Sequence, residues 1–437
     1  MRRLTLDPLT RGWAVVTSAG VVRLGLGFVA SLLIARALGP ADFGIYAVLA
    51  ATVGIVGTLA EGGLTEAAVL RISSAWPARP EAAEMRARSF FWLRLGLSAL
   101  IVGVGCAMAS LISSRVLNDV DVGLLRWALI GIVATAASGA LSAVLQATGG
   151  FGRMSSLILI NTGLTAVLAL VLAAIGRLDL LSTLIILGIG TSLVTYAAAA
   201  RMLPLGFRLR LPSWDDLATE ARQLFETGRW LWIASLFAML TANAEVLLLN
   251  QRVALTLVGT YALALNLATK ADVVNQSLYT VLLPGIASVD VRTQLRDYVR
   301  RGLVRSAGIC LVLLVLIPFA QPLIVLIYGP AYAQSVIYFQ LLLGVMMFDV
   351  LLTPLLLLPL AYRQAKVLAA ADGVRAVTLV VVAVALIPVY GPFGAIAGRF
   401  AARVAGALLV LAALFVTSRS GRQALEVQHP EPTSVLD

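Results

Sequence analysis

Charged residues are scarce in this sequence. Only 13% of its 437 residues are Asp, Glu, Lys or Arg, whereas 60% are apolar. Soluble domains carry about 25% charged residues, so a chain of this length could not cover a water-facing surface with so few. A soluble globular protein is therefore excluded, as are a disordered chain and a collagen. The composition indicates an integral membrane protein with many spans.

Residue types and motifs that enzymes commonly use for catalysis are also rare. The 2 cysteines, Cys106 and Cys310, lie inside apolar runs, which excludes a disulfide scaffold and favours buried, inert thiols. The single histidine, His429, lies in a polar tail, so we expect neither His-based catalysis nor a His metal site. Neither Lys270 nor Lys366 follows a glycine, and no GxxxxGK[ST] loop occurs. GxSxG, HExxH and paired CxxC motifs are missing as well. We expect no Walker-type ATPase, no resident cofactor, no metal and no enzyme.

Long apolar runs fill the chain. A spanning helix needs about 20 apolar residues to cross about 30 Å of hydrocarbon, and twelve such runs are present. The first six predicted spans are Trp13–Leu38, Phe43–Glu61, Ser89–Ile112, Leu124–Ala147, Ser155–Ile175 and Leu181–Ala200. The last six are Trp230–Asn250, Leu257–Leu283, Gly302–Tyr328, Ser335–Leu360, Ala365–Tyr390 and Pro392–Val416. We predict an all-α polytopic membrane protein with about twelve transmembrane helices, in two pseudo-repeated six-helix lobes around a central cavity.

Basic residues are distributed unevenly among the connections between these spans. The segments on the side of the N-terminus hold 22 Lys and Arg residues, whereas those on the opposite side hold only Arg36, Arg115, Arg177 and Arg252. Cytoplasmic loops are enriched in Lys and Arg. We therefore expect a multi-pass protein of the bacterial cytoplasmic (inner) membrane with both termini in the cytoplasm. This asymmetry explains the net charge of +11 without a nucleic-acid partner.

The longest polar interruption lies about halfway along the chain. Within it, Ser213 precedes Asp216 by three residues, a capping-box pattern, and the following apolar residues share one helical face. We interpret this segment as a surface helix that joins the lobes. The predicted parts are an N-terminal lobe (1–200), a cytoplasmic amphipathic linker (201–229), a C-terminal lobe (230–417) and a polar cytoplasmic tail (418–437).

A weak internal repeat supports the two lobes. The tetrapeptide GIYA at 44–47 recurs as GTYA at 259–262, an offset of 215 residues. Both copies lie at the start of the second helix of a lobe, which favours duplication over chance.

Ionisable side chains inside spans are the best candidates for a functional site. A charge at the centre of a span costs about 2.5–3.5 kcal/mol, so such residues face partners or a wet cavity. Arg23 lies ten residues into the first span, about halfway through the bilayer at about 1.5 Å per residue. Gly20, Gly25 and Gly27 thin the helix around it. An interhelical ion pair explains Arg23, but we favour a cationic cavity for an anionic ligand.

The second lobe holds further candidates. Lys270 and Asp272 share a polar helix with Asn266, which we assign to the cavity wall. Glu245 is interpreted either as a counter-ion or as a carrier of a proton or sodium ion. Arg375 is expected to pair with Asp372, three residues earlier in the chain.

Arg399 and Arg403 share one face of the last span. They either partner Asp349 or extend a cationic groove.

Several runs resemble those of a known family. LLIARALGPADFGIYAVLAATVGIVGTLAEGGLTEAAVLRIS resembles the opening of oligosaccharide (O-antigen type, Wzx-like) flippases in the multidrug/oligosaccharidyl-lipid/polysaccharide exporter superfamily. The runs NAEVLLLNQRVALTLVGTYALA, LYTVLLPGIAS, LIYGPAYAQSVIYFQLLLGVMM and LIPVYGPFGAIAGRFAARVAGALLVL are similar as well. Small residues at turns dominate these motifs, so they indicate the family better than the substrate.

The resemblance implies a V-shaped transporter of two lobes that works by alternating access. Its cargo would be a polyprenyl-pyrophosphate-linked oligosaccharide, moved from the cytoplasmic to the outer leaflet. Basic residues on the first helices of each lobe would receive the pyrophosphate, and Arg23 and Lys270 match that description. The candidate substrate-binding residues are Arg23, Asn266, Lys270, Arg399 and Arg403. The candidate counter-ion or ion-coupling residues are Glu61, Glu245, Asp272 and Asp349.

The sequence departs from the family at two places. Glu61 stands where the family often has Asp, and Ala244-Glu245-Val246 replaces an Asp-Arg pair. The resemblance therefore does not carry an ion-coupling role over to Glu245.

The expected partners are the lipid-linked oligosaccharide, the bilayer and other membrane proteins of polysaccharide assembly. With no ATPase in the chain, transport would be driven by an H⁺ or Na⁺ gradient, the membrane potential or consumption of the product. One alternative is a cation-coupled small-molecule or drug exporter of the same fold. Another is a membrane enzyme of glycan assembly, which would need an outer carboxylate such as Asp119 or Asp121.

Overall fold

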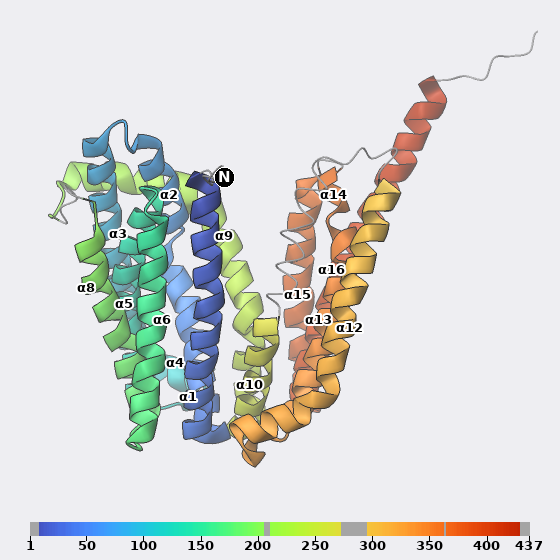
Figure 1. Ribbon diagram of the computed structural model, residues 1–437, viewed down its shortest axis with the longest axis horizontal. Coiled ribbons are helices and arrows are strands. Elements are labelled where there is room, and N and C mark those ends of the chain that lie inside the picture. The colour runs from blue at the N-terminus through green and yellow to red at the C-terminus, as the bar shows by residue number, and fades with distance from the viewer. Residues whose placement is uncertain (1–7, 205–209, 272–294, 362–363, 429–437) are drawn as a thin grey trace, which may run out of the picture. The chain divides into compact units, whose positions relative to one another are not determined.

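The computed structural model describes residues 8–204, 210–271, 295–361 and 364–428 (Figure 1). Within these ranges the chain is helical and contains no β-strand. Its internal contacts form two compact units, each described separately below. The first comprises Met1–Leu263 with Val325–Ala333, and the second comprises Ala264–Ile324 with Gln334–Asp437.

The first unit begins with α1, Pro8–Glu61, which contains both of the first two predicted spans. The helix is interrupted at Gly39, whose φ of 71° and ψ of 173° are not helical. Glycine tolerates this positive φ, and the following Pro40 lacks the N–H that a continuous helix would use. The predicted break between spans is therefore a kink, not a loop.

The remaining helices of the first unit are α2 (Leu64–Ala75), α3 (Pro80–Ala107), α4 (Ala109–Val116), α5 (Val122–Ala147), α6 (Phe151–Ala174), α7 (Leu180–Ser182), the π-helix η1 (Thr183–Gly190), α8 (Thr191–Met202) and α9 (Trp214–Asn250). Several of them pack against α1, above all α6 and α9. α10 (Leu255–Ala271) begins in this unit and ends in the other. One apolar core of this unit joins α2, α3, α5 and α9 through side chains such as Phe90, Leu141 and Leu224.

The start of α9 confirms the predicted helix cap. The Asp216 backbone N–H donates to Ser213 Oγ over 3.2 Å. The helix then continues for 37 residues into the predicted seventh span, and its first turns run across the ends of neighbouring helices (Figure 1). Leu224 is fully buried in the core of the first unit, to which residues 230–263 also belong. The lobe and linker boundaries stay predictions.

The second unit consists largely of long helices. They are α12 (Leu295–Tyr328), α13 (Ser335–Leu356), α14 (Leu358–Ala361), α15 (Ala365–Tyr390) and α16 (Pro392–Gln428). The last residues of α12 and the short 3₁₀-helix η2 (Pro330–Tyr332) belong to the first unit.

Ten helices among the described residues are long and apolar enough to cross a membrane. One of them, Ser18–Glu61, covers two predicted spans, so eleven of the twelve predictions have a counterpart. α10 provides the first part of the predicted eighth span, Leu257–Leu283, whose remainder, with Asp272, lies outside the described residues.

Contacts within the first unit reproduce the offset of the internal repeat. A Cβ atom added at Gly44 would overlap the carbonyl oxygen of Leu255, and one added at Gly259 would overlap that of Pro40. Because Pro40 and Leu255 are also 215 residues apart, the two contacts are reciprocal. This symmetry supports duplication more strongly than the sequence identities do.

A second pair of contacts obeys the same offset. The Tyr332 hydroxyl donates to the Ala35 carbonyl over 2.7 Å, and the Asn250 side-chain amide donates to the Leu117 carbonyl over 2.8 Å. Each bond joins a helix of one repeat to a turn of the other, which explains why residues 325–333 pack with the first unit.

Candidate functional site

Arg23 lies near the middle of the first part of α1, and its side chain is exposed. Among the described residues it has no hydrogen-bond or ion-pair partner, so the alternative of an interhelical pair gains no support. The predicted space beside it is present, because a Cβ atom at Gly20 or Gly25 would meet nothing within 4 Å. A guanidinium so placed in an apolar helix needs water or an anion.

Lys270 lies in the last turn of α10 and is half-buried. Its ammonium group donates to Oδ1 of Asn266, one turn earlier. In the part of the chain that the structure describes, no carboxylate pairs with it. The amide therefore orients the ammonium without neutralising its charge.

Three candidate residues of the second unit meet in one small pocket of about 60 Å³. Asp349 on α13 and Arg399 and Arg403 on α16 line it together with the α10 turn that contains Thr269. Arg403 Nη1 lies 2.7 Å from Asp349 Oδ2, and their side chains are 33% and 12% exposed. The predicted partnership of Asp349 with this pair of arginines is therefore present for Arg403.

The same ion pair borders a second pocket of about 220 Å³, which α15 also lines. Here Arg375 Nη1 lies 3.1 Å from Asp372 Oδ1, as the i, i+3 spacing predicted. Five charged side chains thus line these two adjoining pockets of the second unit, and Arg375 and Arg403 each form an ion pair with a neighbouring carboxylate. Such pairs stabilise helix packing unless a ligand displaces one of the partners.

Glu61 ends α1 in an ion pair that the sequence does not reveal. Its Oε1 lies 2.8 Å from Nη1 of Arg94 on α3, and the same Nη1 donates to the Thr65 hydroxyl. With its charge compensated, Glu61 suits a structural role better than ion coupling.

Glu245 on α9 is completely buried. The Tyr261 hydroxyl, from α10, donates to its Oε2. A buried carboxyl held by a hydroxyl is suited to exchanging a proton, and equally to serving as a fixed counter-ion. Tyr261 belongs to the repeated tetrapeptide, but its role as the partner of Glu245 was not predicted.

A further cluster escaped prediction because its members are far apart in sequence. Arg71 on α2 forms a bidentate ion pair with Glu220 on α9, at 2.8 and 3.0 Å, and also contacts Gln223. Glu220 is only 3% exposed. The sequence offered no signal for this pair, because Glu220 is one of several acidic residues in a polar segment.

The predicted site residues are therefore brought together only in part. Asp349, Arg399 and Arg403 share a pocket, and Asn266 holds Lys270, whereas Arg23, Glu61 and Glu245 occupy separate positions on α1 and α9. Among the described residues no group of three or more His, Cys, Asp and Glu side chains is placed to hold a metal ion. Charge and hydrogen bonding are the chemistry that this arrangement offers.

Comparison with known proteins begins with a family match. The family described as "Polysaccharide biosynthesis protein" matches residues 33–337, which include α1 beyond Leu32 and extend into α13. No curated protein matches the chain significantly in sequence.

Solved structures match over nearly the whole chain. A lipid II flippase MurJ in an inward closed conformation has a TM-score of 0.71 at 12% identity, covering 92% of this chain and 87% of its own. An inward-facing multidrug resistance MATE transporter of the MOP superfamily has a TM-score of 0.68 at 18% identity, covering 94% and 96%. The eukaryotic MATE transporter AtDTX14 has a TM-score of 0.60 at 12% identity, covering 94% and 96%. At these identities the likeness shows the fold alone, which confirms the predicted polytopic helical class.

Proposed function

The chain belongs to the polysaccharide biosynthesis protein family, and from this premise we propose that it is a lipid-linked oligosaccharide flippase. It moves a polyprenyl-pyrophosphate-linked repeat unit of a surface polysaccharide from the cytoplasmic to the outer leaflet by alternating access. The proposal includes a bacterial inner-membrane location with both termini in the cytoplasm. It also includes transport without catalysis, with other polysaccharide-assembly proteins of the membrane as partners.

The observation that carries this proposal is Arg23, which is exposed in the middle of an apolar helix and has no partner among the described residues. A charged side chain at this depth costs about 2.5–3.5 kcal/mol unless water or an anion receives it. A pyrophosphate is an anion that Arg recognises through paired N–H donors. The open space at Gly20 and Gly25 leaves room for such a group.

Lys270 supplies a second positive charge for the same cargo. Its Asn266 partner carries no charge that would neutralise the ammonium, and amide and hydroxyl groups such as Asn266 and Thr269 suit the sugar hydroxyls. Arg399 extends this polar surface, whereas Arg403 is held by Asp349.

Coupling to H⁺ or Na⁺ belongs to the proposal as its energy source. Glu245 is the carboxyl best suited to it, because it is buried, and a hydroxyl donor such as that of Tyr261 can hold it in either protonation state. Glu61 and Asp349 are less suited, because each is held by an arginine.

Native mass spectrometry of gently solubilised protein tests the proposal, with wild type beside Arg23→Ala. We expect a polyprenyl-pyrophosphate saccharide to co-purify with the wild type and to be lost from the variant. Arg36→Ala is the matched control, because Arg36 is an exposed arginine near the kinked end of the same helix. The lipid should persist in that control.

The complementary measurement is surface glycan in cells that carry each variant. Arg23→Ala should abolish export while the protein remains in the membrane. Normal glycan in that variant, together with ordinary phospholipids alone in both purified samples, would contradict the proposal. It would favour the small-molecule exporter.

A further inference from the structure

α12 has two faces of opposite character. One face is buried in the second unit, where Ser306, Leu313 and Ala320 are at most 3% exposed and Cys310 Sγ donates to the Met347 carbonyl of α13. Within the described residues the other face is open: Val304 and Val312 are 65% and 64% exposed. None of the described helices therefore packs on this side of α12.

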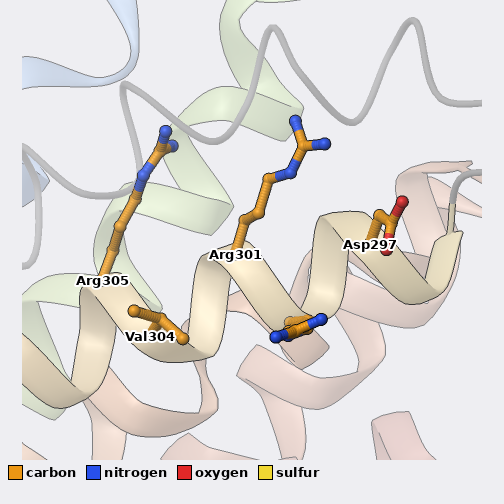
Figure 2. A pocket seen from close by; sticks show the side chains of 5 residues that line it. Asp297, Arg301, Val304 and Arg305 are labelled. Carbon is orange, nitrogen blue, oxygen red and sulfur yellow. The ribbon is translucent and has the colours of Figure 1, made fainter.

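The open face begins with a cluster of arginines. Arg296, Arg300, Arg301 and Arg305 are all exposed, and among the described residues none has an ion-pair partner. Figure 2 shows Arg301 and Arg305, one turn apart, pointing to the same side of the helix. Side chains from Asp297 to Arg305 line a pocket of about 400 Å³. With Asp297 as the one acidic residue, this arginine patch carries a large surplus of positive charge.

An apolar stripe continues from the arginine patch along the same face. Val304, Val312, Val315 and Phe319 lie within about a quarter-turn of the Arg301 direction, and each is more than half exposed. From Val304 to Phe319 the stripe extends about 22 Å, at about 1.5 Å per residue. Half of the hydrocarbon, the depth that one phospholipid chain fills, is only about 15 Å.

We propose that the arginine patch and the apolar stripe of α12 form an entry site for the lipid-linked substrate, separate from Arg23. The patch captures the pyrophosphate at the cytoplasmic surface. The polyprenyl chain lies along the stripe and does not enter the site proposed to receive the charged head group. The inference rests on the proposed function, since it concerns the same cargo.

Charge and length both favour this occupant over a bulk phospholipid. A polyprenyl-pyrophosphate saccharide carries a negative charge on each of two adjacent phosphates, whereas phosphatidylglycerol carries a single one. Arg301 and Arg305, one turn apart, present two guanidinium groups that can each form paired hydrogen bonds to a phosphate. The stripe is also longer than a half-bilayer, which suits a polyprenyl chain better than an acyl chain.

The test is a binding measurement on the full chain in nanodiscs of neutral phosphatidylcholine. A polyprenyl pyrophosphate without sugar is added, and native mass spectrometry counts the complexes that remain. R301Q/R305Q should retain at least about fivefold less of this lipid than wild type, the loss expected for removing two charge-assisted contacts. R153Q/R201Q removes two exposed arginines elsewhere and should bind like wild type.

Two further samples make every outcome decisive. R301K/R305K keeps the charge but loses the paired donors, so it should bind at an intermediate level, and it serves as the test if R301Q/R305Q does not fold. Phosphatidylglycerol offered in place of the polyprenyl pyrophosphate should bind weakly and fail to compete. Equal retention by the Gln or Lys variants, or effective competition by phosphatidylglycerol, would overturn the entry site.

Transport in proteoliposomes separates this inference from the proposed function. If the wild type does not move a lipid-linked saccharide, the proposed function fails. If the wild type moves it and R301Q/R305Q moves it at the same rate, only the entry site fails. The expected result is slower transport by R301Q/R305Q at limiting substrate, recovering as substrate is raised.

Discussion

Two arginines deep in apolar helices of this protein have opposite electrostatic surroundings. Arg403 on α16 lies 2.7 Å from Asp349 and is two-thirds buried against it. Arg23 on α1 is exposed, beside glycines that leave open space, and has no ion-pair partner among the described residues. The first arginine is neutralised by the protein itself, whereas the second depends on something that the chain does not supply.

This difference teaches how to separate structural charges from functional ones in a membrane protein. Depth alone does not distinguish them, because both arginines lie well inside predicted spans. A compensated pair contributes to packing, and breaking it costs stability. An uncompensated charge contributes nothing to packing and is retained only if it serves a ligand or water.

Reversing the charge of Asp349 should have the largest effect on folding, because it removes the carboxylate that distinguishes the surroundings of Arg403 from those of Arg23. Asp349→Arg places three arginines around one pocket, so we expect no monodisperse protein in size-exclusion chromatography. The swap D349R/R403D restores opposite charges and should recover folded protein. Asp349→Asn should cost less than the about 3–5 kcal/mol of a fully buried pair, because Arg403 is one-third exposed. A well-folded Asp349→Arg variant would refute the structural role.

Substitution of Arg23 tests the same difference at the arginine that has no ion-pair partner among the described residues. Arg23→Gln should lower transport at least about tenfold, as expected when a charge-assisted contact worth about 1.5–3 kcal/mol is lost. The melting temperature should not change, because the side chain has no partner to lose. Arg23→Lys keeps the charge without the paired donors and should retain part of the activity. A stability loss comparable to that of Asp349→Asn would show that the two arginines are alike.

The buried Glu245 offers an intermediate case, because its carboxyl accepts a hydrogen bond from a neutral hydroxyl. Tyr261→Phe removes the hydrogen bond to this carboxyl and should cost about 1.5–3 kcal/mol in thermal unfolding. Tyr46→Phe is the matched control from the first repeat: position 30, equivalent to Glu245, is alanine. We expect a change of about 0.5 kcal/mol or less there. Equal effects of the two substitutions would contradict the assigned pair.

The smallest effect is expected at a carboxylate outside the membrane. The backbone N–H of Ser182 donates to Asp179 over 2.7 Å and lowers the pKa of that carboxyl. Asp179→Ala should cost about 1 kcal/mol, the usual value for a lost cap. Because the folded pKa is lowered, this contribution is complete above pH about 4, the ordinary Asp value, and disappears as the pH falls further. Unfolding followed at pH 7 and pH 3 checks this, since the difference between the variant and wild type should be smaller at pH 3 than at pH 7.

Local patterns made much of the fold predictable. The eleventh predicted span has the bounds of α15, Ala365–Tyr390. The Ser213 cap and the pair of Asp372 with Arg375 follow from spacings of three residues. The span follows from one continuous apolar run, and the cap and the pair are each encoded within about one helical turn, where sequence and geometry are directly related.

Contacts across long separations could not be predicted from such patterns. Arg71 and Glu220 are 149 residues apart, and nothing near either residue indicates the other. The π-helix η1 could not be predicted either, because its residues, Thr183–Gly190, suit an ordinary α-helix. For the candidate site, the types of residue were predictable, but which charges are compensated depends on tertiary packing.

Gly44 and Gly259 restrict which residues each position can accept. Each lies against a main-chain oxygen supplied by the other repeat, so a side chain at either position would push the opposite copy away. Elsewhere the copies have drifted apart, as alanine at position 30 and Glu245 show. At the contact of Gly44 and Gly259 the two repeats must evolve together, because a larger residue in one repeat requires the backbone of the other to move.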